Sequence, residues 1–274
     1  MERSSNYIVP TGKGKDSVWE DLSGKLVAKS EISLKKQNTS YVMCRVAATV
    51  IILILSSVVY LYSDSNISTE SAETCEVYLP DGSYVFLQSN SKISFNKKQW
   101  SSNRKIELKG EAFFSVKKGS AFTVQTEAGN VQVLGTKFNV INRNKMFEVA
   151  CISGKVSVSS INETELKILT KGMSTCRLES GELSEPSFTN IERILSRQKG
   201  VFYFEQSDLT LVFKEFERQF NVKIKYIEKE KRKFTGYFSN KKLETALKMV
   251  CKPMELDYDM NDELVVVSGL ARPN

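Results

Sequence analysis

The sequence of 274 residues contains no histidine and only five cysteines, without a Cys-x-x-Cys pair among them. Without imidazole, Ser-His-Asp and Cys-His triads and HExxH zinc helices are excluded. Without a Cys-x-x-Cys pair, zinc ribbons and thioredoxin-type chemistry have no support. Enzymes that use paired carboxylates, lysine or an N-terminal amine are the catalytic designs still open.

Three groups of residues resemble functional sites, but their spacing or surroundings do not support one. The Gly-Lys stretch at 11–15 lacks the phosphate-loop spacing and follows no strand. Glu107 and Glu111 are a carboxylate pair that nothing places across a cleft, so we expect both to be exposed. The basic residues between 223 and 233 alternate with glutamates and offer no stacking platform, which favours a solvated hairpin end over a nucleic-acid site. We therefore predict no enzyme active site, metal, cofactor or nucleic acid.

Long uncharged runs are scarce, and the exception lies at Val46–Tyr62. Extended back to Tyr41, the run would make a helix of about 33 Å, enough for a bilayer core. We predict a transmembrane helix at 42–62; a buried core helix and a signal peptide are the alternatives. Residues 1–45 carry eight basic and five acidic residues, and no Lys or Arg occurs from 63 to 91. By the positive-inside rule, 1–41 is a short cytoplasmic segment and the bulk of the chain is extracytoplasmic.

The cysteines beyond the apolar run are even in number, in a compartment that should be oxidising. They allow three disulfide pairings, among which the sequence does not choose. The other reading is that they are small buried hydrophobic residues. These four cysteines are Cys75, Cys151, Cys176 and Cys251.

Residues 63–75 are rich in Ser and Thr, which predicts a linker. From 76 to 184 short runs alternate apolar and polar residues, and Asp81-Gly82 between two of them indicates a tight hairpin. This pattern predicts a β-rich domain and leaves sandwich, barrel and solenoid open. The apolar positions are Val77, Leu79, Val85, Leu87, Ile106, Leu108, Ala112, Phe114, Val116, Phe122, Val124, Val131, Val133, Phe138, Val140, Val156 and Val158.

Residues 185–274 have a different pattern of apolar residues. Apolar residues at helical spacing run from Leu209 to Phe220, with Ser207 or Asp208 as the N-cap, and recur from Leu243 to Val250. Strands flank both helices, including two around 256–258 and 264–267. We predict a small βαββαβ domain with its helices on one face of a sheet. The fold class is thus mainly β with an α+β C-terminal module.

Gly135-Thr136 is the one local feature with chemistry of its own. A threonine hydroxyl can attack the preceding carbonyl and cleave a strained backbone, and glycine removes the Cβ that would obstruct that approach. The plain alternative is a turn or bulge in a strand.

The motif string resembles the FecR family of membrane-bound anti-sigma factors. It consists of VYLPDGSYVFLQSNSKISF, RKIELKGEAFFSV, AFTVQT and VQVLGTKFNV, in order and spacing. The last seventy residues resemble the C-terminal domain of such proteins, which is similar to the signalling domain of secretins and TonB-dependent receptors. The matched motif positions are Leu79, Pro80, Asp81, Gly82, Ser83, Gly110, Glu111 and Ala112.

This resemblance implies a single-pass regulator of the inner membrane with most of its chain in the periplasm. It implies contact with the signalling domain of a TonB-dependent outer-membrane receptor and with an extracytoplasmic-function sigma factor, and stepwise proteolysis. Gly135-Thr136 aligns with the position at which some family members cleave themselves. The alternative function is a membrane-anchored periplasmic binding or assembly module without sigma-factor regulation; a carboxylate-based glycan hydrolase is the enzyme rival.

The N-terminal segment, at about forty residues, is shorter than the seventy to ninety that family members usually carry. An amphipathic helix in it is our candidate for contact with a sigma factor. The alternative is a juxtamembrane tail without a partner. The candidate contact residues are Val18, Trp19, Leu22 and Leu26.

Overall fold

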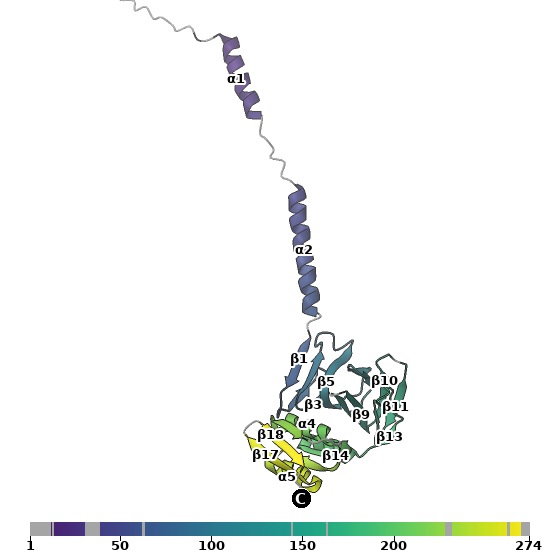
Figure 1. The fold of residues 1–274 in the computed structure, drawn as a ribbon. Coiled ribbons are helices and arrows are strands. Elements are labelled where there is room, and N and C mark those ends of the chain that lie inside the picture. Colours follow the sequence, from purple (N-terminus) through teal and green to yellow (C-terminus); the bar gives the residue numbers. More distant parts are fainter. Residues whose placement is uncertain are drawn as a thin grey trace, which may run out of the picture. The chain divides into compact units, whose positions relative to one another are not determined.

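We describe a computed structural model of the chain. It describes residues 12, 14–30, 39–61, 64–143, 145–162, 164–227, 232–261 and 264–269. The chain divides into two compact units, Met1–Val59 and Tyr60–Asn274, and each is described by itself (Figure 1).

The N-terminal unit contains two helices, α1 (Lys15–Ser30) and α2 (Thr39–Leu61). α2 coincides with the helix predicted at 42–62. Within the described residues, however, no helix meets the length and apolarity needed to cross a membrane. The prediction of a helix here is confirmed, and that of a membrane span is not.

A curled sheet of thirteen strands forms the body of the second unit. One half, sheet A, runs in the order β1-β4-β5-β6-β7-β10-β11, and the other, sheet B, in the order β2-β3-β5-β8-β9-β12-β13. The strands are β1 (Ser65–Thr69), β2 (Cys75–Tyr78), β3 (Tyr84–Leu87), β4 (Ser91–Phe95), β5 (Arg104–Ser115), β6 (Phe122–Gln125), β7 (Gly129–Val133), β8 (Lys137–Arg143), β9 (Met146–Ser153), β10 (Lys155–Ser160), β11 (Leu166–Thr170), β12 (Met173–Cys176) and β13 (Ser187–Phe188).

β5 belongs to both halves and changes neighbours in its middle. Its first part pairs with β4 and β6, and from Gly110 onward it pairs with β3 and β8. Gly110 has φ +105°, and a Cβ there would lie 2.7 Å from the Ser91 Cα. Glycine is therefore required where the shared strand passes from one half of the sheet to the other.

One hydrophobic core lies between sheets A and B. All seventeen apolar positions that alternation predicted between Val77 and Val158 are buried in it. The prediction of a mainly β domain is confirmed; the curled sheet supplies the architecture that periodicity left open.

The predicted linker at 63–75 needs a correction. Residues 65–69 form β1, which pairs with β4 over its whole length. Thr69 is buried, and its hydroxyl donates a hydrogen bond of 2.6 Å to the Gln88 carbonyl. Thr69 thus ties the end of this polar strand to the turn before β4.

A connector joins the β domain to the C-terminal domain and lies against sheet B. It contains α3 (Ile191–Ser196) and the 3-10 turn η1 (Arg197–Lys199). Ile191, Ile194 and Leu195 pack on Phe86, Phe113 and Ile152 on the outer face of sheet B. The connector is therefore fixed to the β domain before the chain enters the C-terminal domain.

In the described residues the C-terminal domain has one strand more than the predicted βαββαβ order and two sheets instead of one, while the strands predicted around 256–258 and 264–267 are both present. One sheet pairs β14 with β16, and the other has the order β15-β18-β17. Both helices contact strands of both sheets, so they lie between the sheets. The elements are β14 (Val201–Asp208), α4 (Leu209–Phe220), β15 (Lys223–Ile227), β16 (Lys233–Ser239), α5 (Leu243–Cys251), η2 (Lys252–Met254), β17 (Leu256–Asn261) and β18 (Leu264–Gly269).

The first helix of this domain begins where the sequence predicts. The Asp208 side chain accepts a hydrogen bond of 2.8 Å from the Thr210 N–H, which makes it the N-cap. Leu209, Val212, Phe213 and Phe216 are buried in the domain core, as their helical spacing indicates.

All five cysteines are free in the structure. Cys151 and Cys251 are buried, and burial raises the pKa of these thiols to about 11 and about 12. Both behave as small hydrophobic residues of the two cores, which is the second of the readings given above.

Candidate functional site

The LPDGS motif forms the turn of the β2–β3 hairpin and anchors it with a charge pair. The Asp81 carboxylate accepts hydrogen bonds of 2.9 Å from the Ser83 N–H and from Arg104 Nε, and it also contacts Arg104 Nη2. Gly82 turns the chain with φ +76°. Burial alone would raise the pKa of Asp81, but the hydrogen bonds from Ser83 and Arg104 bring that pKa below its ordinary value.

Arg104 ties this turn to a second loop. Its Nη1 donates to the Ser120 carbonyl at 2.7 Å and its Nη2 to the Lys117 carbonyl at 3.0 Å. The Ser83 hydroxyl accepts from the Lys117 N–H at 3.0 Å. Asp81, Ser83 and Arg104 are therefore a structural clasp at the start of β5, and the conspicuous motif is explained by folding alone.

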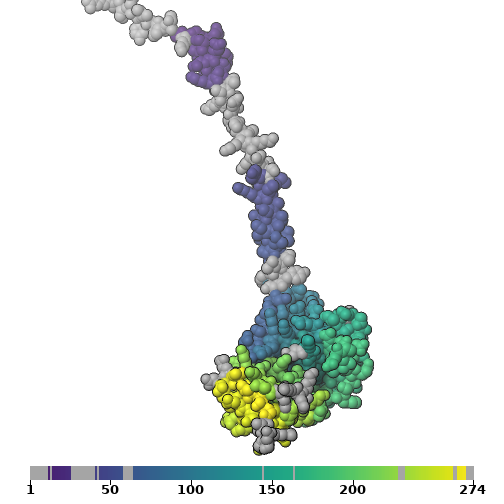
Figure 2. Space-filling model, in the orientation of Figure 1, coloured from purple at the N-terminus to yellow at the C-terminus, as the bar shows by residue number. Residues whose placement is uncertain are grey.

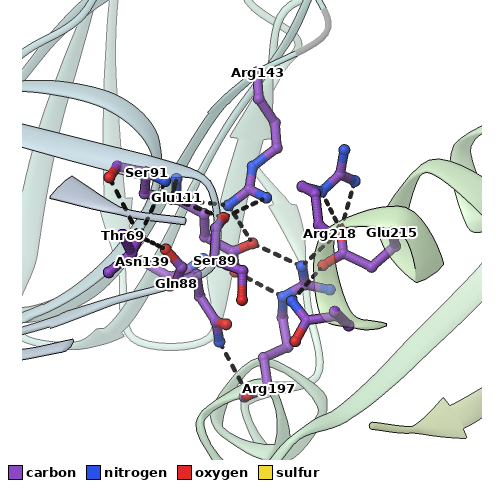
Figure 3. Close-up of polar contacts among 11 residues, drawn as sticks. Thr69, Gln88, Ser89, Ser91, Glu111, Asn139, Arg143, Arg197, Glu215 and Arg218 are labelled. Carbon is purple, nitrogen blue, oxygen red and sulfur yellow. Dashed lines mark hydrogen bonds and ion pairs between the residues drawn. The ribbon is translucent and has the colours of Figure 1, made fainter. Parts of the chain in front are cut away.

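Glu111 is buried, with 1% of its side chain exposed, which corrects the expectation that it is an exposed strand residue. Its two oxygens accept hydrogen bonds of 2.6 Å from Nε and Nη2 of Arg197 in η1 (Figure 3). Arg143 Nη2 lies 3.3 Å from the same carboxylate. The buried charge is tolerated because two guanidinium groups neutralise it. Glu107 is exposed, as expected.

The network continues into α4. Arg197 Nη2 lies 3.6 Å from Glu215 Oε2, and Arg218 Nη2 donates to the same oxygen at 2.6 Å. Burial would raise the pKa of Glu215, but the charges of Arg197, Arg218 and Arg143 outweigh it and hold that pKa at about 2. Glu111, Arg143, Arg197, Glu215 and Arg218 thus form one buried ion network, here called the interdomain network, that joins the β domain to the C-terminal domain (Figure 3). The surfaces of these two domains lie against each other in Figure 2.

A sixth ionisable residue lies at its margin. Glu148 is on β9, and burial raises the pKa of its carboxyl, with a partial opposing effect of Arg197. The interdomain network itself contains three guanidinium groups and two carboxylates.

Gly135-Thr136 lies in the turn between β7 and β8. The Thr136 side chain is buried, and its hydroxyl donates a hydrogen bond of 2.9 Å to the Lys155 carbonyl. A Cβ on Gly135 would lie 2.8 Å from the Lys118 Cα, so the position admits only glycine without a backbone shift. The turn borders an open groove of about 570 Å³, which is also lined by Leu134 and Ile168.

Family sequence models identify the two domains. The model described as "FecR protein" matches residues 65–157, and the model described as "FecR, C-terminal" matches residues 201–267. The chain belongs to the FecR family.

Two solved structures resemble this FecR chain, both of an anti-sigma factor assigned in Parabacteroides distasonis ATCC 8503. One, at 1.65 Å resolution, has 25% sequence identity and a TM-score of 0.70. The other, at 2.50 Å, has 24% identity and a TM-score of 0.71 and shows the fold alone. Each covers 76% of this chain, which in turn covers 100% of each. No curated protein matches the chain at a significant level.

The structure separates the FecR motif positions by role. Leu79 and Ala112 are core residues, Pro80 is exposed in the hairpin turn, and Gly110 marks the change of neighbours in β5. Of the motif positions, only Glu111 contacts the connector, through Arg197. The other members of the network, Arg143, Arg197, Glu215 and Arg218, were missed, because no local pattern in the sequence marks a buried charge. The one available signal was the position of Glu111 within the RKIELKGEAFFSV motif.

The candidate sigma-contact residues lie on α1. Trp19 is 71% exposed, and Val18 and Leu22 are nearly half exposed. Leu26 lies on the same helix, and its side chain is outside the described residues. The predicted helix is confirmed, and its contact with a sigma factor stays a prediction.

Proposed function

We propose that this FecR protein is a regulator of the anti-sigma-factor type, which works through protein contacts rather than turnover. The observation that carries the proposal is the pairing of a FecR domain with a FecR C-terminal domain, together with the likeness of 76% of the chain to a solved anti-sigma factor structure. In this role, the signalling domain of a TonB-dependent outer-membrane receptor contacts the large unit. An extracytoplasmic-function sigma factor is then released or activated at the other end of the chain.

The exposed tryptophan of α1 supports a contact at the N-terminal end. Trp19 on a helix offers a large apolar surface of the kind that anchors helix-in-groove recognition. Val18 and Leu22 add apolar surface next to it.

Co-purification of the tagged full-length chain from its own cells tests this function. We expect a sigma factor in the eluate of the wild type and of Lys25→Ala, a change at an exposed residue of the same helix. Trp19→Glu should lose it, because the charge removes the apolar anchor. An eluate without a sigma factor in the wild type would contradict the proposal and favour the periplasmic assembly module.

We also propose that the chain is held at the inner membrane with its N-terminus in the cytoplasm. The uncharged run at Val46–Tyr62 and the basic excess before it support this placement. Fractionation of cells tests it: the chain should stay in the membrane pellet after extraction with alkaline carbonate. Full release into the supernatant would overturn the placement.

Self-cleavage between Gly135 and Thr136 is the processing step we propose. The Thr136 Oγ attacks the Gly135 carbonyl carbon, the C–N bond between the two residues breaks, and the hydroxyl proton passes to the freed amine. Water then hydrolyses the ester, which leaves a carboxylate on Gly135 and restores the hydroxyl.

A C-terminal tag makes this step visible. An immunoblot should show a fragment of residues 136–274 in the wild type and only the full chain in Thr136→Ala. Thr123→Ala, on the neighbouring strand β6, is the control and should cleave normally. A wild type that stays intact would show that the turn is only structural.

A further inference from the structure

A groove of about 860 Å³ lies between the β domain and the C-terminal domain, along β15. Five cationic residues, drawn from both domains, and one carboxylate line it. The lining residues that carry charge are Arg143, Lys214, Glu217, Arg218, Lys223 and Lys225.

The single carboxylate of the groove is already engaged. Glu217 accepts a hydrogen bond of 2.9 Å from the Ile224 N–H. Lys214, Lys223 and Lys225 form no ion pair with any acidic residue in the described ranges. The groove therefore presents positive charge that the described part of the chain leaves uncompensated.

β15 contributes an open strand edge. It pairs in parallel with β18 on one side, and the described residues place no strand on its other side. Because main-chain groups of a strand alternate between its two sides, the Ile224 N–H that meets Glu217 marks the side away from β18. A further strand can add to this edge when its acidic side chains or main chain displace the Glu217 carboxylate from the Ile224 N–H.

Arg143 closes the wall of the groove from the β domain. Its side chain is 8% exposed, and its Nε is buried without a hydrogen-bond partner in the described structure. Its Nη atoms contact Glu111, Ser89 and Ser91. The Nε–H is therefore the one donor of this guanidinium that lacks an acceptor among the described residues.

We propose that this groove binds an extended acidic segment of a partner protein, which adds to the edge of β15 and places its carboxylates on Lys223, Lys225 and Lys214. Aromatic side chains are absent from the residues that line the groove. Single-stranded nucleic acids, whose binding depends on stacking, are therefore the weaker match. The inference goes beyond regulation of a sigma factor, because it holds whether or not α1 contacts one.

Fluorescence anisotropy with the full chain tests the proposal, with a labelled peptide of alternating glutamate and valine as the probe. We expect saturable binding that weakens with added salt, and no comparable binding of the lysine-valine peptide or of oligo(dT). The double change Lys223→Glu/Lys225→Glu should weaken binding by about ten-fold or more, since it reverses the charge beside the strand edge. Lys241→Glu/Lys252→Glu, at exposed positions outside the groove, is the matched control and should bind like the wild type.

A peptide of alternating glutamate and proline tests strand addition separately, because proline cannot donate to a strand edge. It should bind about ten-fold more weakly than the valine peptide, since it loses main-chain hydrogen bonds. Equal binding of the two peptides, equal binding of oligo(dT), or undiminished binding by the groove variant would each overturn the proposal. Trp19→Glu should bind the peptide normally, so failure of this inference is distinguishable from failure of the proposed function.

Discussion

Arg104 holds two loops together through a single guanidinium group. We expect Arg104→Met to destabilise the β domain by about 3 kcal/mol, because it leaves Asp81 without its countercharge and two carbonyls without a donor. Urea unfolding followed by tryptophan fluorescence measures the change. Lys105→Met, at the next position of β5, is the control and should cost less than about 1 kcal/mol. Equal losses in both variants would contradict the structural clasp.

The lowered pKa of Glu215 predicts how the stability of the fold depends on pH. Its pKa is about 2 in the folded protein against an ordinary value of 4.5, so folding favours its charged form. Its contribution is complete above pH 4.5 and is lost as the pH falls toward 2. Asp81, whose pKa is also lowered, acts in the same direction.

Thermal melts between pH 6 and pH 2.5 test this dependence. The melting temperature should fall on acidification in the wild type and fall less steeply in Glu215→Gln, which has no proton to gain there. Glu107→Gln, an exposed carboxyl on β5, is the control and should keep the slope of the wild type. An unchanged slope in Glu215→Gln would show that other carboxyls govern acid unfolding.

At the scale of the element, the change of neighbours in the middle of β5 depends on a glycine, Gly110. We expect Gly110→Ala to cost about 3 kcal/mol or more, because the new methyl group meets the Ser91 main chain and the positive φ strains alanine. Circular dichroism during chemical unfolding measures the loss. Lys109→Ala, one residue earlier and exposed, should leave stability within about 0.5 kcal/mol. Tolerance of alanine at 110 would mean that β4 can move away.

The elements were predictable where alternation marks a buried face. Ile106, Leu108, Phe122 and Val124 are buried as their spacing requires, and α4 begins at its predicted cap. β1 was not predictable, because its Ser and Thr residues resemble a linker, and the bond from Thr69 to the Gln88 carbonyl is known only from the fold. In the C-terminal domain each helix has a buried face, but periodicity does not tell how many sheets that face meets.

At the scale of the molecule, the sequence could not predict how the two domains meet. Glu111 and Arg197 are 86 residues apart, and each alone resembles an ordinary surface charge. Only the fold brings them together, together with Glu215 of α4. The sequence identified the Gly135-Thr136 turn from its residues. It did not predict the hydrogen bond from the Thr136 hydroxyl to the Lys155 carbonyl, because alternation does not show which strand lies beside the turn.

Arg197 is the residue through which the two domains are coupled, because it pairs with Glu111 on one side and Glu215 on the other. We expect Arg197→Met to weaken that coupling by about 3–5 kcal/mol, since each carboxylate keeps only one guanidinium partner in a buried site. Differential scanning calorimetry of the full chain should then resolve separate transitions for the β domain and the C-terminal domain, where the wild type shows one. Arg193→Met, in the same connector but in an exposed pair with Glu205, is the matched control and should keep the single transition. A single transition in Arg197→Met would mean that the apolar contacts of the connector, rather than the interdomain network, carry the coupling.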